Sequence, residues 1–230
     1  MSRLQFSVQF NGRPPKAHLA DLGNLALGSR FSRTVSQFYD DAVLLISHLY
    51  ASVPEVSDAY NALQEPILKA DFFRYLVLLA QGGIYSDVDT QALRPVVEWV
   101  PARMKSWGLV VGIEADPDRP DWRDWYARRI QFCQWTIVSK PGHPVLVDIV
   151  ASITEKTLEQ STQGQSNPQL SVMEFTGPGA WTDSLFHFFE TNDPVTKMEA
   201  ASWKPFANLT QPTQHVDVVV LPITSFSPGW

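Results

Sequence analysis

The sequence predicts an α/β fold in which a mixed central sheet is flanked by helices. Residues 66–81 form a long apolar run of helical character, and a short alternating strand follows it at once. The runs at 109–115 and 216–223 are almost continuously apolar, which is typical of strands buried on both faces. Helical patterns separate these strands along the chain, and strands that alternate with helices build α/β sheets.

The composition indicates one globular domain that does not bind nucleic acid. A chain of 230 residues usually forms one domain, and 44% hydrophobic residues, with eight Trp among them, supply a large core. The net charge of −6 argues against a nucleic-acid partner, because such partners bind basic surfaces. Cys133 is the single cysteine, so no disulfide can form within the chain. No run reaches the length of a membrane span, and the sequon Asn208-Leu209-Thr210 would be usable only in a lumenal compartment.

The chain divides into a less regular start and a long patterned remainder. Within residues 1–39, strand-like alternation is limited to 4–10, so we expect an incomplete N-terminal segment there. Residues 40–230 are regular enough to be expected as one domain. Its further expected elements are helices over 40–52, 54–63 and 144–160, a strand over 132–139, and a helix within 176–190.

Residues 66–81 have clear signals for the start and end of a buried helix. Pro66 suits the first turn, and Gly82 with Gly83 suits a left-handed helix end. Asp71 and Arg74 stand inside the apolar run, three residues apart and therefore on one face. Buried charges of opposite sign at this spacing either pair with each other or face a ligand.

The strand after the two glycines carries an acidic pair. Alternation predicts that its residues point to two faces, Ile84, Ser86 and Val88 to one and Tyr85, Asp87 and Asp89 to the other. Two carboxylates about 7 Å apart on one face repel each other unless a cation lies near them. Hard oxygen ligands suit Mg²⁺ or Mn²⁺, whose remaining ligands can be water and substrate phosphate. We therefore expect a site for a metal-bound diphosphate.

A second Asp-x-Asp, formed by Asp116 and Asp118, lies in a Pro-rich loop beside Arg119. We expect these carboxylates to face water or the arginine and to be dispensable for metal binding. The aromatic and basic residues of 122–129 have two interpretations, a sugar-stacking wall with diphosphate-binding arginines or the edge of the core, and the second is favoured.

Three other polar positions have structural interpretations in the sequence. His143 is expected in a turn, and His187 is expected as a core histidine among phenylalanines. Thr182 or Asp183 is expected to cap the helix that follows Gly177-Pro178-Gly179. None of these residues is therefore assigned to a site.

Several ordered blocks resemble one family. The block KADFFRYLVLLAQGGIYSDVDT at 69–90 closely resembles the signature of glycosyltransferase family 32, whose sugar-binding region contains a DXD motif. It is most similar to the fungal initiation-specific α-1,6-mannosyltransferases. The blocks at 109–116, 128–146, 176–183 and 218–229 also resemble that family. Residues 1–39 are divergent from its pattern, so the resemblance implies a glycosyltransferase catalytic domain over 40–230.

The resemblance implies a GT-A-like nucleotide-sugar transferase fold and a metal-dependent, retaining reaction. A hexose, mannose from GDP-mannose, would be moved in α-1,6 linkage to a glycan or glycoprotein acceptor in the Golgi lumen. In the family pattern Asp87 and Asp89 hold Mn²⁺ or Mg²⁺ and are the catalytic pair, and Asp87 also contacts the donor. Asp71 and Arg74 lie against the nucleoside and diphosphate, and Tyr85 packs on the ribose. No side chain is identifiable as a nucleophile.

Two other functions fit the same residues. The chain could be a non-catalytic relative or an impaired fragment that binds a sugar nucleotide without turnover. It could also resemble the clostridial glucosylating toxins, which share the Asp-x-x-Arg and Asp-x-Asp arrangement and act on protein. The SKPGHP and SFSPG blocks are more similar to the fungal glycan enzymes.

Overall fold

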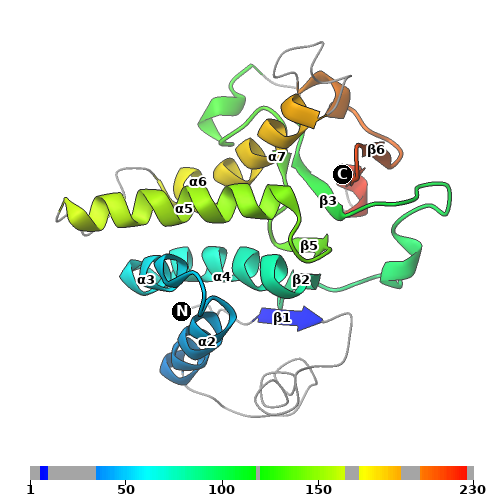
Figure 1. Ribbon diagram of the computed structural model, residues 1–230. Helices are drawn as coiled ribbons and strands as arrows, with labels where there is room; N and C mark the ends of the chain where they lie inside the picture. The colour runs from blue at the N-terminus through cyan, green and yellow to red at the C-terminus, as the bar shows by residue number, and fades with distance from the viewer. Residues whose placement is uncertain (1–5, 10–34, 118–119, 164–170, 193–202, 227–230) are drawn as a thin grey trace.

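The computed structural model describes residues 6–9, 35–117, 120–163, 171–192 and 203–226, and its sheet is mixed (Figure 1). Within these residues seven strands pair in the order β1-β2-β5-β3-β7-β6, with β4 joined to β3 alone. β3 and β7 are parallel, and the other pairs are antiparallel. The strands are β1 Phe6–Gln9, β2 Gly83–Asp87, β3 Leu109–Ala115, β4 Gln131–Phe132, β5 Thr136–Ser139, β6 Thr213–His215 and β7 Val218–Leu221.

Helices flank this sheet, so the predicted α/β fold is confirmed. Figure 1 shows α4 and α5 lying side by side against the sheet, with α7 beyond α5 and α2 on the other side of α4, while α3 packs against α5 and α2. The α-helices are α2 Val35–Leu49, α3 Pro54–Ala62, α4 Pro66–Gln81, α5 Pro144–Thr162, α6 Val172–Phe175 and α7 Pro178–Asn192. Single 3-10 turns are η1 Val96–Glu98, η2 Trp122–Asp124, η3 Lys204–Phe206 and η4 Ile223–Ser225.

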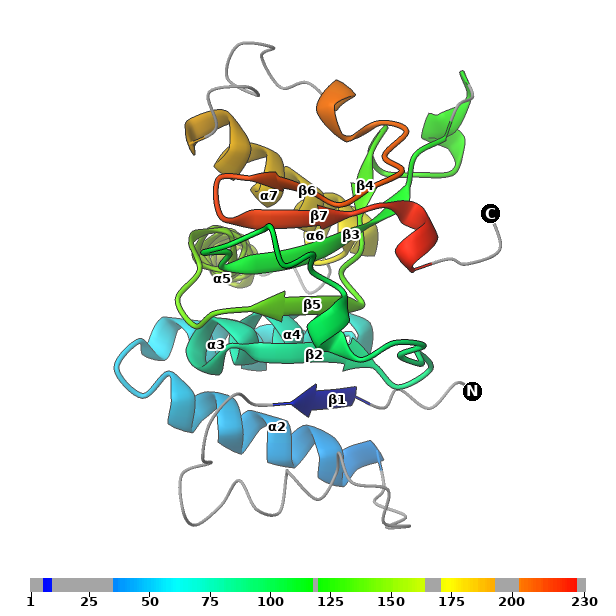
Figure 2. The ribbon, with the colours of Figure 1, turned by 90° about the vertical axis from the view of Figure 1, so that its right-hand side faces the viewer.

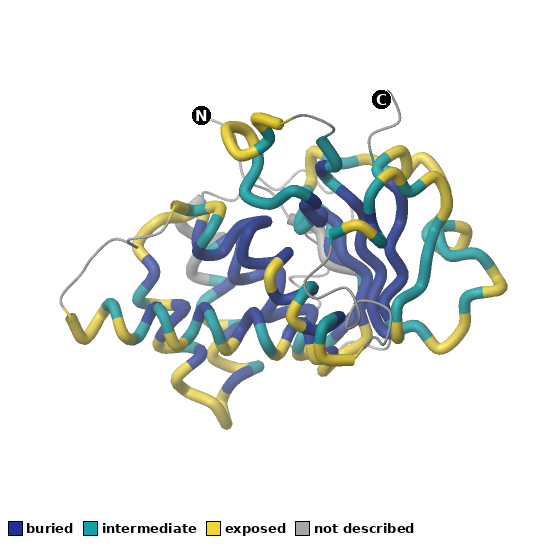
Figure 3. The backbone as a smooth tube through the Cα atoms, turned by 90° about the horizontal axis from the view of Figure 1, so that it is seen from above, coloured by how far each residue is buried: buried dark blue, intermediate teal, exposed yellow. Residues whose placement is uncertain are grey.

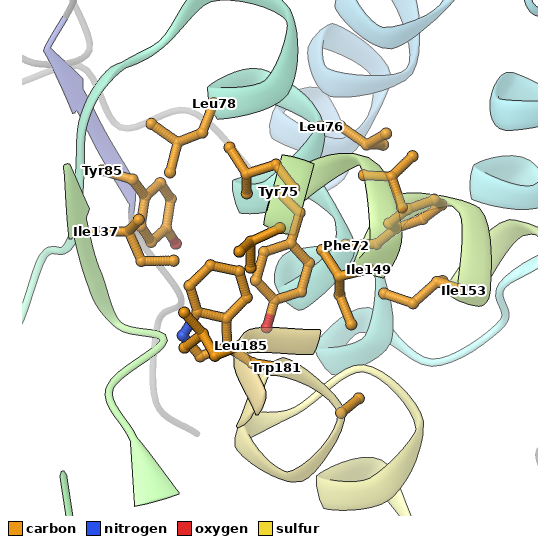
Figure 4. Packing of buried hydrophobic residues seen from close by; sticks show 14 of the residues in the cluster. Phe72, Tyr75, Leu76, Leu78, Tyr85, Ile137, Ile149, Ile153, Trp181 and Leu185 are labelled. Carbon is orange, nitrogen blue, oxygen red and sulfur yellow. The ribbon is translucent and has the colours of Figure 1, made fainter. Parts of the chain in front are cut away.

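The main core lies between the helices and one face of the sheet. Figure 4 shows Tyr75 of α4 against Trp181 of α7, with Tyr85 and Ile137 entering from the strands. The rings of Tyr75 and Trp181 are stacked with centroids 5.3 Å apart, an arrangement that contributes about 0.5–1.5 kcal/mol beyond the burial of apolar area. The inner strands β3, β5 and β7 are almost wholly buried, as Figure 3 shows.

The opposite face of the sheet is covered by a segment with little regular structure. Val110, Val138, Val219 and Leu221 form a second apolar cluster there. It is covered by residues of the segment between β2 and β3 and by Phe226, and these are Val96, Trp99, Val100, Met104 and Trp107. Phe226 lies so close to Gly112 that a side chain at residue 112 would clash with the Phe226 ring.

The end of α4 is fixed against the turn that precedes α5. Gly82 has a φ of 64° and donates its backbone N–H to Leu78 O at 2.8 Å, which confirms the expected glycine helix end. A Cβ at Gly82 would lie 2.6 Å from Pro141 Cδ, so only glycine fits this approach. Gly142 in turn donates its N–H to Leu79 O at 2.8 Å. The end of α4 and the start of β2 are therefore closely defined.

The structure corrects the strand predicted over 132–139. The segment is divided into β4 and β5, and residues 133–135 leave the ladder between them. Two contacts hold this break, because Cys133 N–H donates to Gly112 O at 2.8 Å and the Trp181 indole donates to Cys133 O at 3.1 Å. A continuous strand would have placed the residues of 133–135 in regular alternation. At the break, the backbone oxygen of Trp135 instead accepts the N–H of Asp87 at the end of β2.

The helix predicted after 176 begins earlier than its expected caps. α7 starts at Pro178, so Thr182 and Asp183 lie inside it and cap nothing. Asp183 instead accepts a hydrogen bond from Arg128 Nε at 2.6 Å. His187 is 68% exposed and lies 2.9 Å from Asp148, so the prediction of a core histidine is wrong. The helix presents this position to solvent while its phenylalanine neighbours turn inward.

His143 precedes α5 in a turn, as predicted, and its Nδ1 accepts the backbone N–H of Val145 at 3.3 Å.

Candidate functional site

The acidic pair lies at the edge of the sheet where β2, β3 and β7 end. Because β5 is antiparallel to both β2 and β3, these two strands run in the same direction and finish at the same edge, the right-hand edge in Figure 2. In open α/β sheets ligands bind outside the carboxyl ends of the strands. Asp87 is the last residue of β2, whereas Asp89 stands in the turn that follows.

The predicted strand therefore ends two residues early. Thr90 closes a turn after Asp87, because its side-chain hydroxyl and its backbone N–H both donate to the carbonyl oxygen of Asp87. Alternation along a strand does not extend to Asp89, which is exposed in the turn, while Asp87 is partly buried. The two carboxylates thus differ in environment.

Arg74 connects the buried helix to the end of this strand. Its Nη2 lies 2.9 Å from Asp71 Oδ1 and 3.7 Å from Asp87 Oδ1. The side chains of Arg74 and Asp71 are only 5% and 2% exposed, so of the two predicted alternatives, a mutual pair or a contact with a ligand, the structure shows the pair. The guanidinium also lies over the ring of Tyr85, 5.2 Å from its centroid. Burial would lower the pKa of Arg74, but Tyr85 and the two carboxylates raise it and keep the guanidinium charged.

Asp71 is held from several sides. Its Oδ2 accepts from Thr176 Oγ1 at 2.9 Å, and its Oδ1 accepts from Gln134 Nε2 at 3.3 Å. Tyr75 extends the network, since its hydroxyl contacts Gln134 Oε1 at 2.5 Å and Thr176 O at 3.0 Å. Burial raises the pKa of Asp71 to about 6, against the lowering effects of Arg74, Thr176 and Gln134. Asp71 is therefore a buried anchor of Arg74.

Tyr85 supports Asp87 from below. The ring of Tyr85 is fully buried, and its hydroxyl donates to Asp87 Oδ1 at 2.7 Å. The resemblance implies that Tyr85 packs on the ribose, but a ring without exposed surface cannot do so in this structure. Tyr85 instead orients the Asp87 carboxylate at the end of its own strand.

Asp87 and Asp89 are suited to a hard divalent cation. Burial raises the pKa of Asp87, Arg74 and Tyr85 oppose the rise, and the charge of Asp89 adds to it. A cation would relieve this repulsion. Tyr85 and Arg74 engage Oδ1 of Asp87, so its Oδ2 and the exposed Asp89 are the oxygens in position to bind a metal. No group of three His, Cys, Asp or Glu side chains within the described ranges forms a metal site, so water and substrate oxygens would complete the shell.

The other polar residues singled out in the sequence are engaged elsewhere. Asp116 lies 3.5 Å from Arg129 and accepts the backbone N–H of Asn208, which makes it part of a loop contact. Asp118 and Arg119 lie outside the described residues. Arg128 binds Glu174 and Asp183, and the guanidinium of Arg129 lies over the ring of Trp203.

The arginines of 122–129 are thus bound to acids or stacked on rings. Arg123 lies over Trp122, and Trp125 is 63% exposed. The exposed Trp125 does not cover the core, and the charges are paired or stacked and do not simply face solvent, so the favoured interpretation stays a prediction.

Several residues at the site were not found from the sequence. Gln134 and Thr176 donate to Asp71 from positions 63 and 105 residues away in the chain, and the Tyr75 hydroxyl, one helical turn after Asp71, contacts both of them. No sequence pattern connects them. Glu114 is different, because it is the single charge in the apolar strand β3, and that isolation was a readable signal.

Comparisons with known proteins identify a family for this chain. Residues 24–107 match the family described as glycosyltransferase sugar-binding region containing DXD motif. This range includes Asp71, Arg74, Asp87 and Asp89. An initiation-specific α-1,6-mannosyltransferase of Candida albicans is 50% identical over 205 residues, which cover 80% of this chain and 53% of that protein.

The chain belongs to this DXD-containing glycosyltransferase family. A protein of the same name from Schizosaccharomyces pombe is 50% identical over 192 residues, covering 82% of this chain and 47% of that protein. The chain thus spans about half the length of these two curated relatives. Among the described parts of the chain, no helix combines the length and apolarity needed to cross a bilayer.

Proposed function

We propose that this chain carries the catalytic domain of a metal-dependent, retaining glycosyltransferase. It moves a hexose, mannose from GDP-mannose in α-1,6 linkage, to a glycan or glycoprotein acceptor, and the Golgi lumen is its proposed location. The observation that carries this proposal is the acidic pair at the carboxyl edge of the sheet, held over a buried Arg74. The choice of mannose and of the α-1,6 linkage rests on the names of the relatives. GDP as the nucleotide rests on the family resemblance alone.

The acidic pair, through its metal ion, and Arg74 would both interact with the negative charge of a sugar nucleotide. Asp87 and Asp89 would hold Mn²⁺ or Mg²⁺. A divalent cation bound there would neutralise the charge that develops on the departing nucleoside diphosphate. Arg74 keeps Asp87 in place from beneath, and its Nε has no hydrogen-bond partner among the described residues. That buried N–H is a donor available to an anionic ligand.

The proposed stereochemistry follows from the two linkages. GDP-mannose is an α-linked donor, so an α-1,6 product requires retention of configuration. Retention can proceed through a covalent intermediate or on one face of the sugar, and the proposal assigns no nucleophile. Asp71 is bound by Arg74, Thr176 and Gln134, which suits a supporting part rather than attack on the sugar.

Calorimetry with purified protein tests the donor and the metal together. GDP-mannose and UDP-glucose are titrated into the protein with Mn²⁺ and with EDTA. We expect binding of GDP-mannose that requires Mn²⁺, and its loss in Asp89→Asn. Asp58→Asn is the matched control, because Asp58 is exposed on α3, away from the acidic pair in the chain. Equal binding of GDP-mannose with EDTA would contradict the metal-dependent site.

Transfer is measured separately on a mannose-containing oligosaccharide. Formation of an α-1,6-linked mannosyl product supports the full proposal. Metal-dependent donor binding without product would instead favour the non-catalytic sugar-nucleotide-binding relative. Transfer of glucose to a protein side chain would favour activity like that of the glucosylating toxins.

A further inference from the structure

Glu114 stands at the same edge of the sheet as the acidic pair, it lies outside the matched residues 24–107, and the proposed function gives it no role. It is the next-to-last residue of β3, at an irregularity in the pairing with β4 between Ile113 and Ala115. Gln131 Nε2 donates to Glu114 Oε2 at 2.9 Å, and the Trp135 side chain also donates to the carboxylate. The side chain is partly buried.

Trp135 connects Glu114 to the acidic pair. Its backbone oxygen accepts the N–H of Asp87 at 2.8 Å, while its side chain binds Glu114. The Trp135 ring packs edge-on against Phe226, with centroids 5.3 Å apart. Because this one residue contacts both carboxylate-bearing segments, the position of Glu114 relative to Asp87 is defined.

The strand order sets the separation of the two carboxylate-bearing positions. β5 lies between β2 and β3, so the ends of β2 and β3 are two strand spacings apart, roughly 9–10 Å. This gap accommodates one six-membered sugar ring with a hydrogen bond of about 2.8 Å on either side. A hexose on a diphosphate held at Asp87 and Asp89 would therefore extend towards Glu114.

The chemistry of Glu114 also favours a ligand with hydroxyl donors. It is a partly buried carboxylate at the end of an apolar strand, where Gln131 donates to one of its two oxygens. Burial raises the pKa of Glu114, which shows that its ionised form is partly desolvated. A purely structural side chain that accepts hydrogen bonds from Gln131 and Trp135 could be a neutral amide at lower cost. A carboxylate at this point suits a ligand with several hydroxyl donors.

We propose that Glu114 accepts hydrogen bonds from hydroxyl groups of the transferred hexose, across the site from the metal-bound diphosphate. This inference rests on the proposed function and deepens it, since it assigns the sugar end of the donor to the end of β3. Gln131 and Trp135 are positioning residues, because they hold the carboxylate without contacting the sugar.

The test compares a sugar nucleotide with the nucleoside diphosphate alone. In Mn²⁺, Glu114→Gln should weaken binding of GDP-mannose by about tenfold or more, because a hydrogen bond to a charged acceptor is lost. Binding of GDP should change less than twofold, since GDP has no hexose. Trp135→Phe keeps an aromatic ring against Phe226 and removes the indole donor. It should therefore lower the ratio of GDP-mannose affinity to GDP affinity, by a smaller factor than Glu114→Gln does. Glu98→Gln in η1 is the control and should change neither affinity.

The outcomes separate the two proposals. If the ratio of GDP-mannose to GDP affinity is unchanged in Glu114→Gln, the assignment of Glu114 is wrong, even when GDP binds normally. If wild-type protein binds neither ligand in Mn²⁺, the proposed function itself fails. Should Glu114→Gln not fold by circular dichroism, Glu114→Asp replaces it, and an unchanged ratio in that shorter carboxylate likewise overturns the inference.

Discussion

Arg74 on α4 and Asp87 at the end of β2 lie 3.7 Å apart, and the same guanidinium lies 2.9 Å from Asp71. One buried cation therefore compensates carboxylates from two different elements. The free energy of this arrangement depends on all three residues, because removal of one partner leaves a buried charge uncompensated.

Arg74→Met should destabilise the protein strongly. The substitution keeps apolar volume near Tyr85 but leaves Asp71 buried without its cation, at a cost of about 3–5 kcal/mol in the free energy of unfolding. The double variant Arg74→Met with Asp71→Asn should recover a large part of this loss, because the uncompensated carboxylate is removed as well. Urea unfolding followed by fluorescence measures both. Additive losses in the double variant would show that the two charges are not coupled.

Asp71 should make stability fall as the pH rises between about 4 and about 6. The pKa of Asp71 is 3.8 in an unfolded reference and about 6 in the folded protein, so the folded state binds the proton more tightly in this window. The free energy of unfolding then decreases with rising pH and levels off above about 6, by at most about 3 kcal/mol for this group.

The contribution of Asp71 is isolated by measuring wild type and Asp71→Asn at each pH. As the pH rises from 4 to 6, the unfolding free energy of wild type should fall relative to that of Asp71→Asn. Asp58→Asn, an exposed substitution on α3, is measured in parallel as the control. A difference for Asp71→Asn that stays constant over the same range would contradict the raised pKa.

Asp89→Asn and Asp87→Asn should both lose Mn²⁺-dependent donor binding without loss of the fold. Asp89 is exposed, so its substitution should leave the melting temperature of the metal-free protein nearly unchanged. In Asp87→Asn an amide oxygen can still accept the Tyr85 hydroxyl, and relief of carboxylate repulsion offsets the weaker contact with Arg74. Differential scanning fluorimetry with and without Mn²⁺ checks both variants. A Mn²⁺-induced stabilisation that persists in both would exclude this pair as the metal site.

Asp116→Asn should leave metal binding intact and reduce stability only slightly. The side chain contacts Arg129 and the backbone N–H of Asn208, and loss of its charge should cost about 1 kcal/mol. Mn²⁺-dependent binding of GDP is the readout, with Asp89→Asn measured in parallel. Loss of binding in Asp116→Asn alone would mean that the second Asp-x-Asp is the metal site.

The local elements were predictable because their signals are local. Pro66 and Gly82 delimit α4 through backbone geometry, and the apolar runs of β3 and β7 need no knowledge of their neighbours. The pairing of Asp71 with Arg74 was also readable, since three residues separate them on one helix.

What the sequence did not reveal depends on tertiary packing. The break at 133–135 is held by Gly112 and Trp181, which are far away in the chain. His187 has apolar neighbours in sequence, yet the helix turns it outward to Asp148. The network of Tyr75, Gln134 and Thr176 around Asp71 likewise exists only after α4, α6 and the break are brought together.

The contact between Gly82 and the turn at Pro141 has a consequence for amide exchange. The N–H groups of Gly82 and Gly142 are both bonded to carbonyls of the last turn of α4, so they should exchange with deuterium more slowly than unbonded amides, and the buried Gly82 more slowly than the exposed Gly142. The segment between β2 and β3, with little regular structure and with the exposed Leu93 and Val97, should exchange through local opening. Asp89 stands at the boundary between these two regimes. We therefore expect local opening in the segment that follows Asp89, while the strand that ends at Asp87 stays protected.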